Sequence, residues 1–370
     1  MADVVHPYRD LPDFCFWSRA MTWPAPGHID PVTTAPQVRD DELIATIGSC
    51  FAQHLARHLK ARGLKYFVSE NAPDGLSEAK AHRRNYGIFS ARYGNVYTVR
   101  QAVQLLDRAF GRFTPEEIAW PRDGGFVDPF RPQIEPEPFS SVAHVMRSAL
   151  DHLAHVREVF TRCDWLVFTL GLTEAWRAKS DGAVYPLAPG VAGGTFDPDR
   201  YEFVNFGIDE VRADLALFVD RLASVNKKAR VLLTVSPVPL IATYEQRHVW
   251  VSTTYSKAVL RIAADEIERR YSNVFYFPSY EIITSPAAGG RYYRDDLREV
   301  TEIGVRHVMR VFEAHYLQEL HSGKLSFEEQ LENDPVSSEN GRAAPAIVCD
   351  EEVIQKALRE SGFAASHHQS

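Results

Sequence analysis

The chain has 370 residues, of which 45% are hydrophobic and 11% aromatic, enough to build the core of one large globular domain or of two ordinary ones. Its 41 basic and 49 acidic residues leave a formal net charge of -8, which argues against nucleic acid as the main partner. The sequence shows neither a basic leader with an apolar core nor a run near the roughly 18 apolar residues of a membrane span, so we expect a cytoplasmic protein.

The cysteines are scattered along the chain without the paired spacing of a disulfide framework or a zinc site. They are therefore expected to be free thiols, and no cofactor or metal is predicted. The residues concerned are Cys15, Cys50, Cys163 and Cys349.

Strand and helix patterns alternate after a Pro-rich entry over residues 7–36. The first strand is expected at 43–47, a helix at 51–62, a short strand at 65–69 and a helix at 96–110. Residues 111–140 are rich in Pro, Gly and aromatic residues and have no clear period. They are expected to form an insertion.

The second half of the chain continues the same alternation. The near-continuous apolar run at 164–170 is typical of a central parallel strand that is buried on both faces. Residues 177–206 are expected to form a second insertion. The other expected elements are strands at 230–235 and 274–277 and helices at 141–161, 209–225, 252–271 and 301–320.

This order predicts an α/β fold with a doubly wound, mainly parallel five-stranded sheet. A single domain is expected over residues 1–321. Residues 322–370 turn polar and are expected to be mostly a disordered tail, with a short helix near 351–361 as a candidate docking element of unspecified target.

The segment 44–52 combines an apolar strand, a tight turn at Gly48 and a helix start, and it places Ser49 at the turn. This arrangement is typical of a nucleophile, since the turn exposes the hydroxyl and the amides at the helix start stabilise an oxyanion. The alternative is that Ser49 only caps the helix. Cys50 has the same two interpretations, either a nucleophile or a small residue that packs the junction.

Sites in open parallel sheets lie outside the carboxyl ends of the strands. Segments that contain polar residues and glycine follow several predicted strands, and together they predict a cleft lined by polar side chains. These segments are Ser49, the loop with 85–87 and 94–95, residues 171–174, residues 236–248 and residues 295–299.

Gly48-Ser49-Cys50-Phe51-Ala52 matches letter for letter the motif of the GSCFA family, which looks related to the SGNH/GDSL esterases. The resemblance extends over residues 6–320, because further segments are similar to family blocks in the same order. They are residues 85–87, 169–174, 236–238 and 277–281. It implies a three-layer, flavodoxin-like domain.

The resemblance implies that Ser49 is the nucleophile and that its own amide is one oxyanion donor. Asn85 and Gly87 mark the loop expected to supply the Gly donor, with Gly94 as a rival. Gly171, Thr173 and Glu174 stand where the esterases carry Gly-x-Asn-Asp. The Thr173 hydroxyl is able to donate, but it is shorter than an amide.

The catalytic base is the largest departure from the esterase pattern. Asp296 and Glu299 occupy the place of Asp-x-x-His, so a Glu replaces the imidazole. A solvated carboxylate with a pKa near ~4 is a far weaker base than imidazole. Glu299 would serve as the base if burial raised its pKa, and His248 would serve by supplying an imidazole from a neighbouring loop. His307 is less suitable, because it lies ~12 Å further along a helix. Both candidates also have a non-catalytic interpretation. Residues 294–299 would form a solvated charge cluster, which is favourable near a helix start without any catalysis, and His248 would be a surface or packing residue.

These features predict a Ser-dependent ester hydrolase or acyltransferase acting on a small-molecule or carbohydrate acyl ester. The second hypothesis is a ligand-binding protein that has lost the base. Phosphate or nucleotide binding is disfavoured, because no Walker or Gly-x-Gly-x-x-Gly sequence occurs. The sequence leaves the oligomeric state open. Aromatic residues of the insertions would suit a sugar or simply pack the insertions down, and they are Trp120, Phe126, Phe130, Trp176 and Tyr185.

Overall fold

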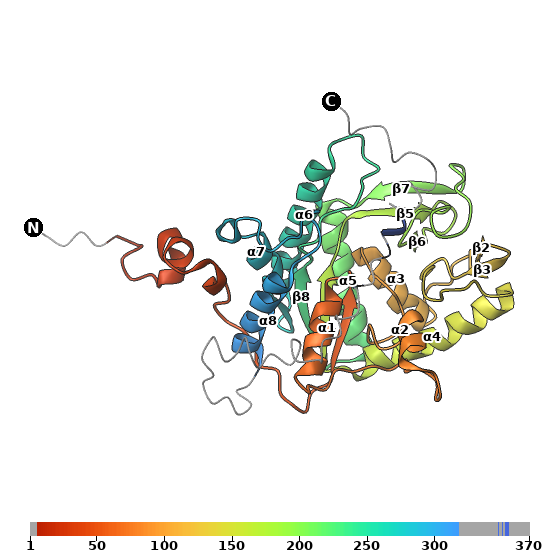
Figure 1. Cartoon of the computed structure of the whole chain (residues 1–370), viewed down its shortest axis with the longest axis horizontal. Coiled ribbons are helices and arrows are strands. Elements are labelled where there is room, and N and C mark those ends of the chain that lie inside the picture. The colour runs from red at the N-terminus through yellow and green to blue at the C-terminus, as the bar shows by residue number, and fades with distance from the viewer. Residues whose placement is uncertain (1–5, 318–346, 348–349, 351, 355–370) are drawn as a thin grey trace, which may run out of the picture.

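The computed structural model describes residues 6–317, 347, 350 and 352–354. Its centre is a parallel four-stranded sheet in the order β1-β4-β8-β9 (Figure 1). The strands are β1 (Ile44–Gly48), β4 (Trp165–Leu170), β8 (Arg230–Val235) and β9 (Val274–Tyr276). The doubly wound α/β class predicted from the sequence is confirmed.

The predicted fifth strand at 65–69 is reduced to a single parallel bridge between Ile44 and Tyr66. Two backbone hydrogen bonds support it, from Ile44 N to Lys65 O and from Phe67 N to Ile44 O. The sheet therefore has four strands, and this segment continues its edge beside β1 over only a few residues.

Successive residues of a strand face opposite sides of the sheet, and both sides are covered by helices. Ala45, Phe168 and Leu233 pack on one side against α3 (Val99–Ala109), α4 (Val142–Arg162), α5 (Ile208–Val225) and α6 (Val249–Arg270). Ile44 and Val167 pack on the other side against α1 (Ala52–Ala61), α7 (Ser279–Thr284) and α8 (Glu302–Tyr316). The core therefore consists of two layers separated by the sheet.

The two insertions pack against each other at the edge of the domain. The first forms a hairpin of β2 (Trp120–Arg122) and β3 (Gly125–Val127), and the second belongs to an antiparallel sheet in the order β6-β5-β7. The strands of that sheet are β5 (Glu174–Ala178), β6 (Val184–Tyr185) and β7 (Tyr201–Asn205). The rings of Trp120 and Tyr185 lie 4.8 Å apart and are fully buried, so these two aromatic residues pack the insertions together.

The remaining described elements are short. They are the turns η1 (Asp13–Cys15), η2 (Ser18–Thr22), η3 (Pro26–His28) and η4 (Pro286–Ala288) and the helix α2 (Glu78–Arg83). In Figure 1 the segment that carries η1 and η2, in red, extends away from the sheet. Of the helix predicted near 351–361, residues 352–354 are described and are helical. Among the described residues, no helix is both long and apolar enough to cross a membrane.

Candidate active site

Ser49 lies at the carboxyl end of β1, directly before α1, as the strand, turn and helix pattern predicts. Gly48 makes this possible, because its φ of 127° is one that L side chains rarely adopt. A Cβ at Gly48 would lie 2.8 Å from the backbone N and C of Thr169 in β4, and closer still to its O. The turn therefore requires glycine, both because of its φ and because β4 leaves no room for a Cβ.

Three segments that are distant in sequence meet at Ser49. Val96 N donates to Gly48 O at 2.8 Å, and Gly171 N donates to Tyr97 O at 3.1 Å. A Cβ on Gly171 would stand only 3.1 Å from the Cβ of Ser49 and 2.9 Å from Tyr97 O. The loops after β1 and β4 and the segment before α3 thus enclose the Ser49 side chain.

The Ser49 hydroxyl is buried at 3% exposure, and its Oγ has no hydrogen-bond partner among the described residues. The Ser49 amide donates to Thr169 O at 3.1 Å, so the predicted oxyanion donor is engaged in the sheet. An unpaired, buried hydroxyl at a strand end is uncommon in native proteins and calls for an explanation.

Helix α6 holds the loop after β4 in place. The buried Lys257 donates from Nζ to Gly171 O at 2.6 Å, and Thr173 N donates to the hydroxyl of Ser256 at 3.0 Å. This loop touches Ser49, so α6 positions it through two adjacent side chains. No sequence pattern pointed to Lys257, because a lysine on an amphipathic helix normally lies on its solvent face.

Thr173 and Glu174 organise the rim of the site. The Thr173 hydroxyl donates to Asn205 Oδ1 at 2.7 Å, so it is committed to β7. Glu174 Oε1 accepts from the Thr243 hydroxyl at 2.7 Å and Oε2 from Tyr244 N at 3.3 Å. Burial raises the pKa of Glu174, and the Thr243 bond opposes this rise. Glu174 therefore ties the loop after β8 to β5.

Asn85 and Gly87 lie away from Ser49. Asn85 Nδ2 donates to Gln133 O at 3.1 Å, and Gly87 O accepts from Lys60 Nζ near the end of α1. Ser49 precedes the opposite end of that helix, whose first residue Ala52 is about 12 Å from Lys60 at 1.5 Å per residue. The rival position, Gly94, lies two residues before Val96, whose backbone N donates to Gly48 O.

The three candidate bases make no hydrogen bond to Ser49. His248 is exposed and caps α6, with Nδ1 accepting from Trp250 N at 3.1 Å. Glu299 pairs with Arg294 at 3.2 Å, with both side chains more than half exposed. Burial raises the pKa of Asp296, but hydrogen bonds from the amides of Arg298 and Glu299 outweigh it and lower the pKa overall.

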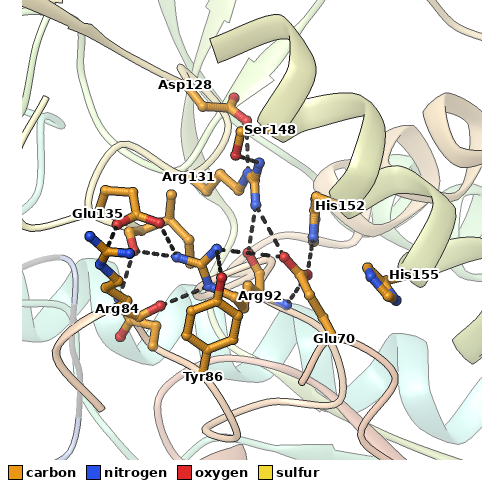
Figure 2. Close-up of polar contacts among 12 residues, drawn as sticks. Glu70, Arg84, Tyr86, Arg92, Asp128, Arg131, Glu135, Ser148, His152 and His155 are labelled. Carbon is orange, nitrogen blue, oxygen red and sulfur yellow. Dashed lines mark hydrogen bonds and ion pairs between the residues drawn. The ribbon is translucent and has the colours of Figure 1, made fainter. Parts of the chain in front are cut away.

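A buried network of charges supports the loop that carries Asn95 (Figure 2). Glu70 Oε2 accepts from Arg92 N and from His152 Nδ1, both at 2.7 Å. Arg131 Nε pairs with Asp128 at 2.8 Å. In Figure 2 the two guanidinium groups of Arg92 and Arg131 both face Glu70, so the network joins the segments around residues 70, 92 and 131.

Opposite charges keep these acids ionised despite their burial. Burial raises the pKa of Glu70, but the His152 hydrogen bond and the charge of Arg131 bring it to about 2. Burial and Arg131 lower the pKa of His152 to about 4, so its ring is neutral at pH 7. Burial also raises the pKa of Asp128, but Arg131 and Arg108 outweigh it.

Replacement of Arg131 by methionine is expected to destabilise the protein by about 3–5 kcal/mol, because Asp128 would stay buried without its closest partner. The shift of the urea midpoint at constant m-value measures this loss. Arg269→Met removes an ion pair whose arginine is 79% exposed, and it should cost less than about 1 kcal/mol. Equal losses in the two variants would contradict the role of the network.

A protein-family model described as the GSCFA family matches residues 43–312. No curated protein matches. Among solved structures, a match is the crystal structure of a carbohydrate esterase family 2 enzyme plus carbohydrate binding domain from Corynascus thermopiles (Myceliophthora fergusii), at 13% identity and a TM-score of 0.24. That match covers 67% of this chain and 58% of the other.

Proposed function

Because this chain belongs to the GSCFA family, we propose that it is a Ser-dependent ester hydrolase or acyltransferase whose nucleophile is Ser49. The observation that carries the proposal is the buried Ser49 hydroxyl, which lacks a hydrogen-bond partner among the described residues. Leaving such a group unpaired costs about 1–3 kcal/mol. Costs of this kind are typical of functional sites.

The proposed reaction begins with attack of Ser49 Oγ on the carbonyl carbon of an ester. The bond to the alcohol breaks, the alcohol leaves with a proton, and the acyl group stays on Ser49. Water or an acceptor hydroxyl then takes the acyl group. We assign the oxyanion to Asn95 Nδ2, which belongs to the segment whose Val96 N donates to Gly48 O. The amides of Ala52, Gln53 and His54 in the first turn of α1 are not assigned to it, because they donate to the carbonyls three residues before them. The charge of Lys257 at the Gly171 loop adds to this stabilisation.

An acylated carbohydrate is the substrate class that the rim of the site favours. Trp176 lies two residues after Glu174 on the same face of β5. Its ring contacts the rings of Phe196, Phe203 and Tyr244, at centroid distances of 5.2, 5.9 and 4.8 Å. Residues Phe196 and Tyr244 are 42% and 62% exposed, so this group presents aromatic surface to a ligand.

The second candidate function is ligand binding without catalysis. It is supported by the exposed positions of His248 and Glu299 and by the commitment of the Thr173 hydroxyl to Asn205. A site of this kind would keep the enclosed Ser49 and lack a base beside it.

Labelling with a fluorophosphonate separates the two candidates. We expect one adduct per chain, mapped to Ser49 by mass spectrometry, and turnover of p-nitrophenyl acetate. No adduct and no turnover across a pH series with several acyl esters would favour the binding protein. The same assay assigns the base, because loss in His248→Ala with retention in Glu299→Gln identifies the imidazole, and the reverse identifies Glu299.

A further inference from the structure

Residues 6–25 form an arm that the domain does not bury. None of these residues is buried, and the first buried residue in the described part of the chain is Ile29. The arm still has a defined shape, because Arg19 Nη1 pairs with Asp13 Oδ1 at 2.8 Å and Trp23 N donates to Ser18 O at 2.9 Å. It is therefore folded by its own contacts, and in Figure 1 it extends away from the domain.

The arm carries a row of large apolar side chains. Tyr8, Leu11, Phe14 and Trp17 recur at every third position, and Trp23 follows directly after η2. The four aromatic residues of this row are between 57% and 70% exposed. An aromatic side chain buries about 150–250 Å² when it is fully covered, so the arm offers roughly 400–600 Å² of aromatic surface. Exposed apolar surface of this extent often marks an interaction site.

The charges of the arm favour a protein over a lipid surface as its partner. Arg9 and Arg19 are balanced by Asp10 and Asp13, and Arg19 is already paired with Asp13. Segments that lie on membranes carry an excess of Lys and Arg, because anionic lipids attract these residues. The whole chain has a net charge of -8, which such lipids repel.

Helix α6 has a second apolar stripe, on the side away from the core. Val251, Tyr255 and Ile262 are 52%, 37% and 50% exposed, and their spacing places them on one side of the helix. The core side of α6 consists of other residues. Trp250 is exposed beside Val251 and extends the stripe at the start of the helix. A helix that is apolar on two sides is normally buried on both, so this stripe lacks a partner among the described residues.

The α6 stripe continues to the rim of the candidate site. The Thr243 hydroxyl donates to the hydroxyl of Ser252 in α6 at 3.0 Å, so the loop after β8 packs on the start of this helix. Tyr244 lies in the same loop, is exposed, and has its ring 4.8 Å from the ring of Trp176. A partner on the stripe would therefore border the aromatic group at the rim.

We propose that the partner is a second copy of this chain and that the arm of each copy lies on the α6 stripe of the other. One chain supplies both surfaces, so a two-fold pair covers both arms and both stripes in the same way. Each arm would bury roughly 400–600 Å² of its own surface and a similar area of the other copy. Two such contacts bury roughly 1,600–2,400 Å², whereas a stable interface needs about 1,200–2,000 Å². This dimer does not depend on the proposed function of Ser49.

The test measures the mass of the full-length protein by analytical ultracentrifugation over a range of concentrations. We expect a dimer with twice the chain mass of 41.8 kDa. The double variants Trp17→Ala/Trp23→Ala and Val251→Asp/Ile262→Asp should each raise the dimer dissociation constant about 100-fold or more, because a few buried anchors carry most of the binding energy of an interface. Leu150→Asp, at an exposed apolar position in α4, is the matched control and should leave the constant unchanged.

A mixture of the two double variants tests the exchange of arms itself. The α6 variant keeps an intact arm and the arm variant keeps an intact stripe, so one of the two contacts still forms between them. The mixture should therefore dimerise at concentrations where each variant alone is a monomer. Pairing of α6 with α6, or of arm with arm, would give no such rescue.

The remaining outcomes would overturn the exchange. A wild-type chain that is monomeric at every concentration would do so, and so would a dimer that both variants leave intact. Loss of the dimer in only one of the two variants would indicate pairing of like surfaces. A monomer that binds vesicles of phosphatidylcholine and phosphatidylserine, and loses this binding in Trp17→Ala/Trp23→Ala, would identify the arm as a membrane anchor. Fluorophosphonate labelling of Ser49 tests the proposed function separately from all of these outcomes.

Discussion

Replacement of Ser49 by alanine is expected to abolish ester turnover and to leave the fold as stable as that of the wild type, or more stable. Removal of the attacking oxygen should lower kcat/KM by at least about 10³-fold, or about 4 kcal/mol of transition-state stabilisation. The stability change has the opposite sign, because the variant removes a buried hydroxyl that has no partner among the described residues. Turnover of p-nitrophenyl acetate and thermal unfolding measure the two effects.

Ser90 provides the matched control for this prediction. It is as buried as Ser49, but its hydroxyl accepts from Thr46 N at 3.0 Å. Ser90→Ala should therefore destabilise the protein by about 1–3 kcal/mol, whereas Ser49→Ala should not. Full turnover by Ser49→Ala would remove Ser49 from the mechanism, and Cys50→Ser would then test the neighbouring thiol.

Replacement of Gly48 by alanine is expected to prevent stable folding. The new Cβ would lie within 3 Å of three backbone atoms of Thr169, at a φ of 127° that strains any side chain. Those atoms belong to the central strand β4, which cannot move away without loss of its pairing with β1. We expect a loss of more than about 4 kcal/mol, a large part of the stability of an ordinary domain. Soluble yield and urea unfolding measure it.

Gly63 is the control for the backbone strain alone. It also has a positive φ, of 71°, but no atom lies within 4 Å of the position of its Cβ. Gly63→Ala should cost only about 1–2 kcal/mol. If Gly48→Ala has a similar cost, the close approach of the two strands does not limit what residue 48 can be.

Most of the fold could be predicted from local patterns. The strands β1, β4 and β8 and the helices around them have the expected positions because burial on both faces gives continuous apolar runs, and burial on one face gives a helical period. The segment at 65–69 looked like a strand for the same reason. Only its two hydrogen bonds with Ile44 could show that it pairs over a single bridge.

The site was less predictable, because its residues come from different loops. Gly171 could be placed from its position after β4, and it does lie against Ser49. The choice of Gly87 over Gly94 could not be settled from spacing. Both lie in one polar loop, and the hydrogen bond from Val96 N to Gly48 O places Gly94 on the Ser49 side. Lys257 had no sequence signal at all.

The sequence by itself determined the order of strands and helices and the turn that displays Ser49, because both depend on residues that are neighbours in the chain. The tertiary structure alone decided which side chains surround that hydroxyl. Gly171 lies against Ser49 because β1 and β4 are parallel neighbours, and Lys257 of α6 holds the Gly171 carbonyl. Asp350 reaches Asn95 from more than 200 residues away, through hydrogen bonds that no local pattern encodes.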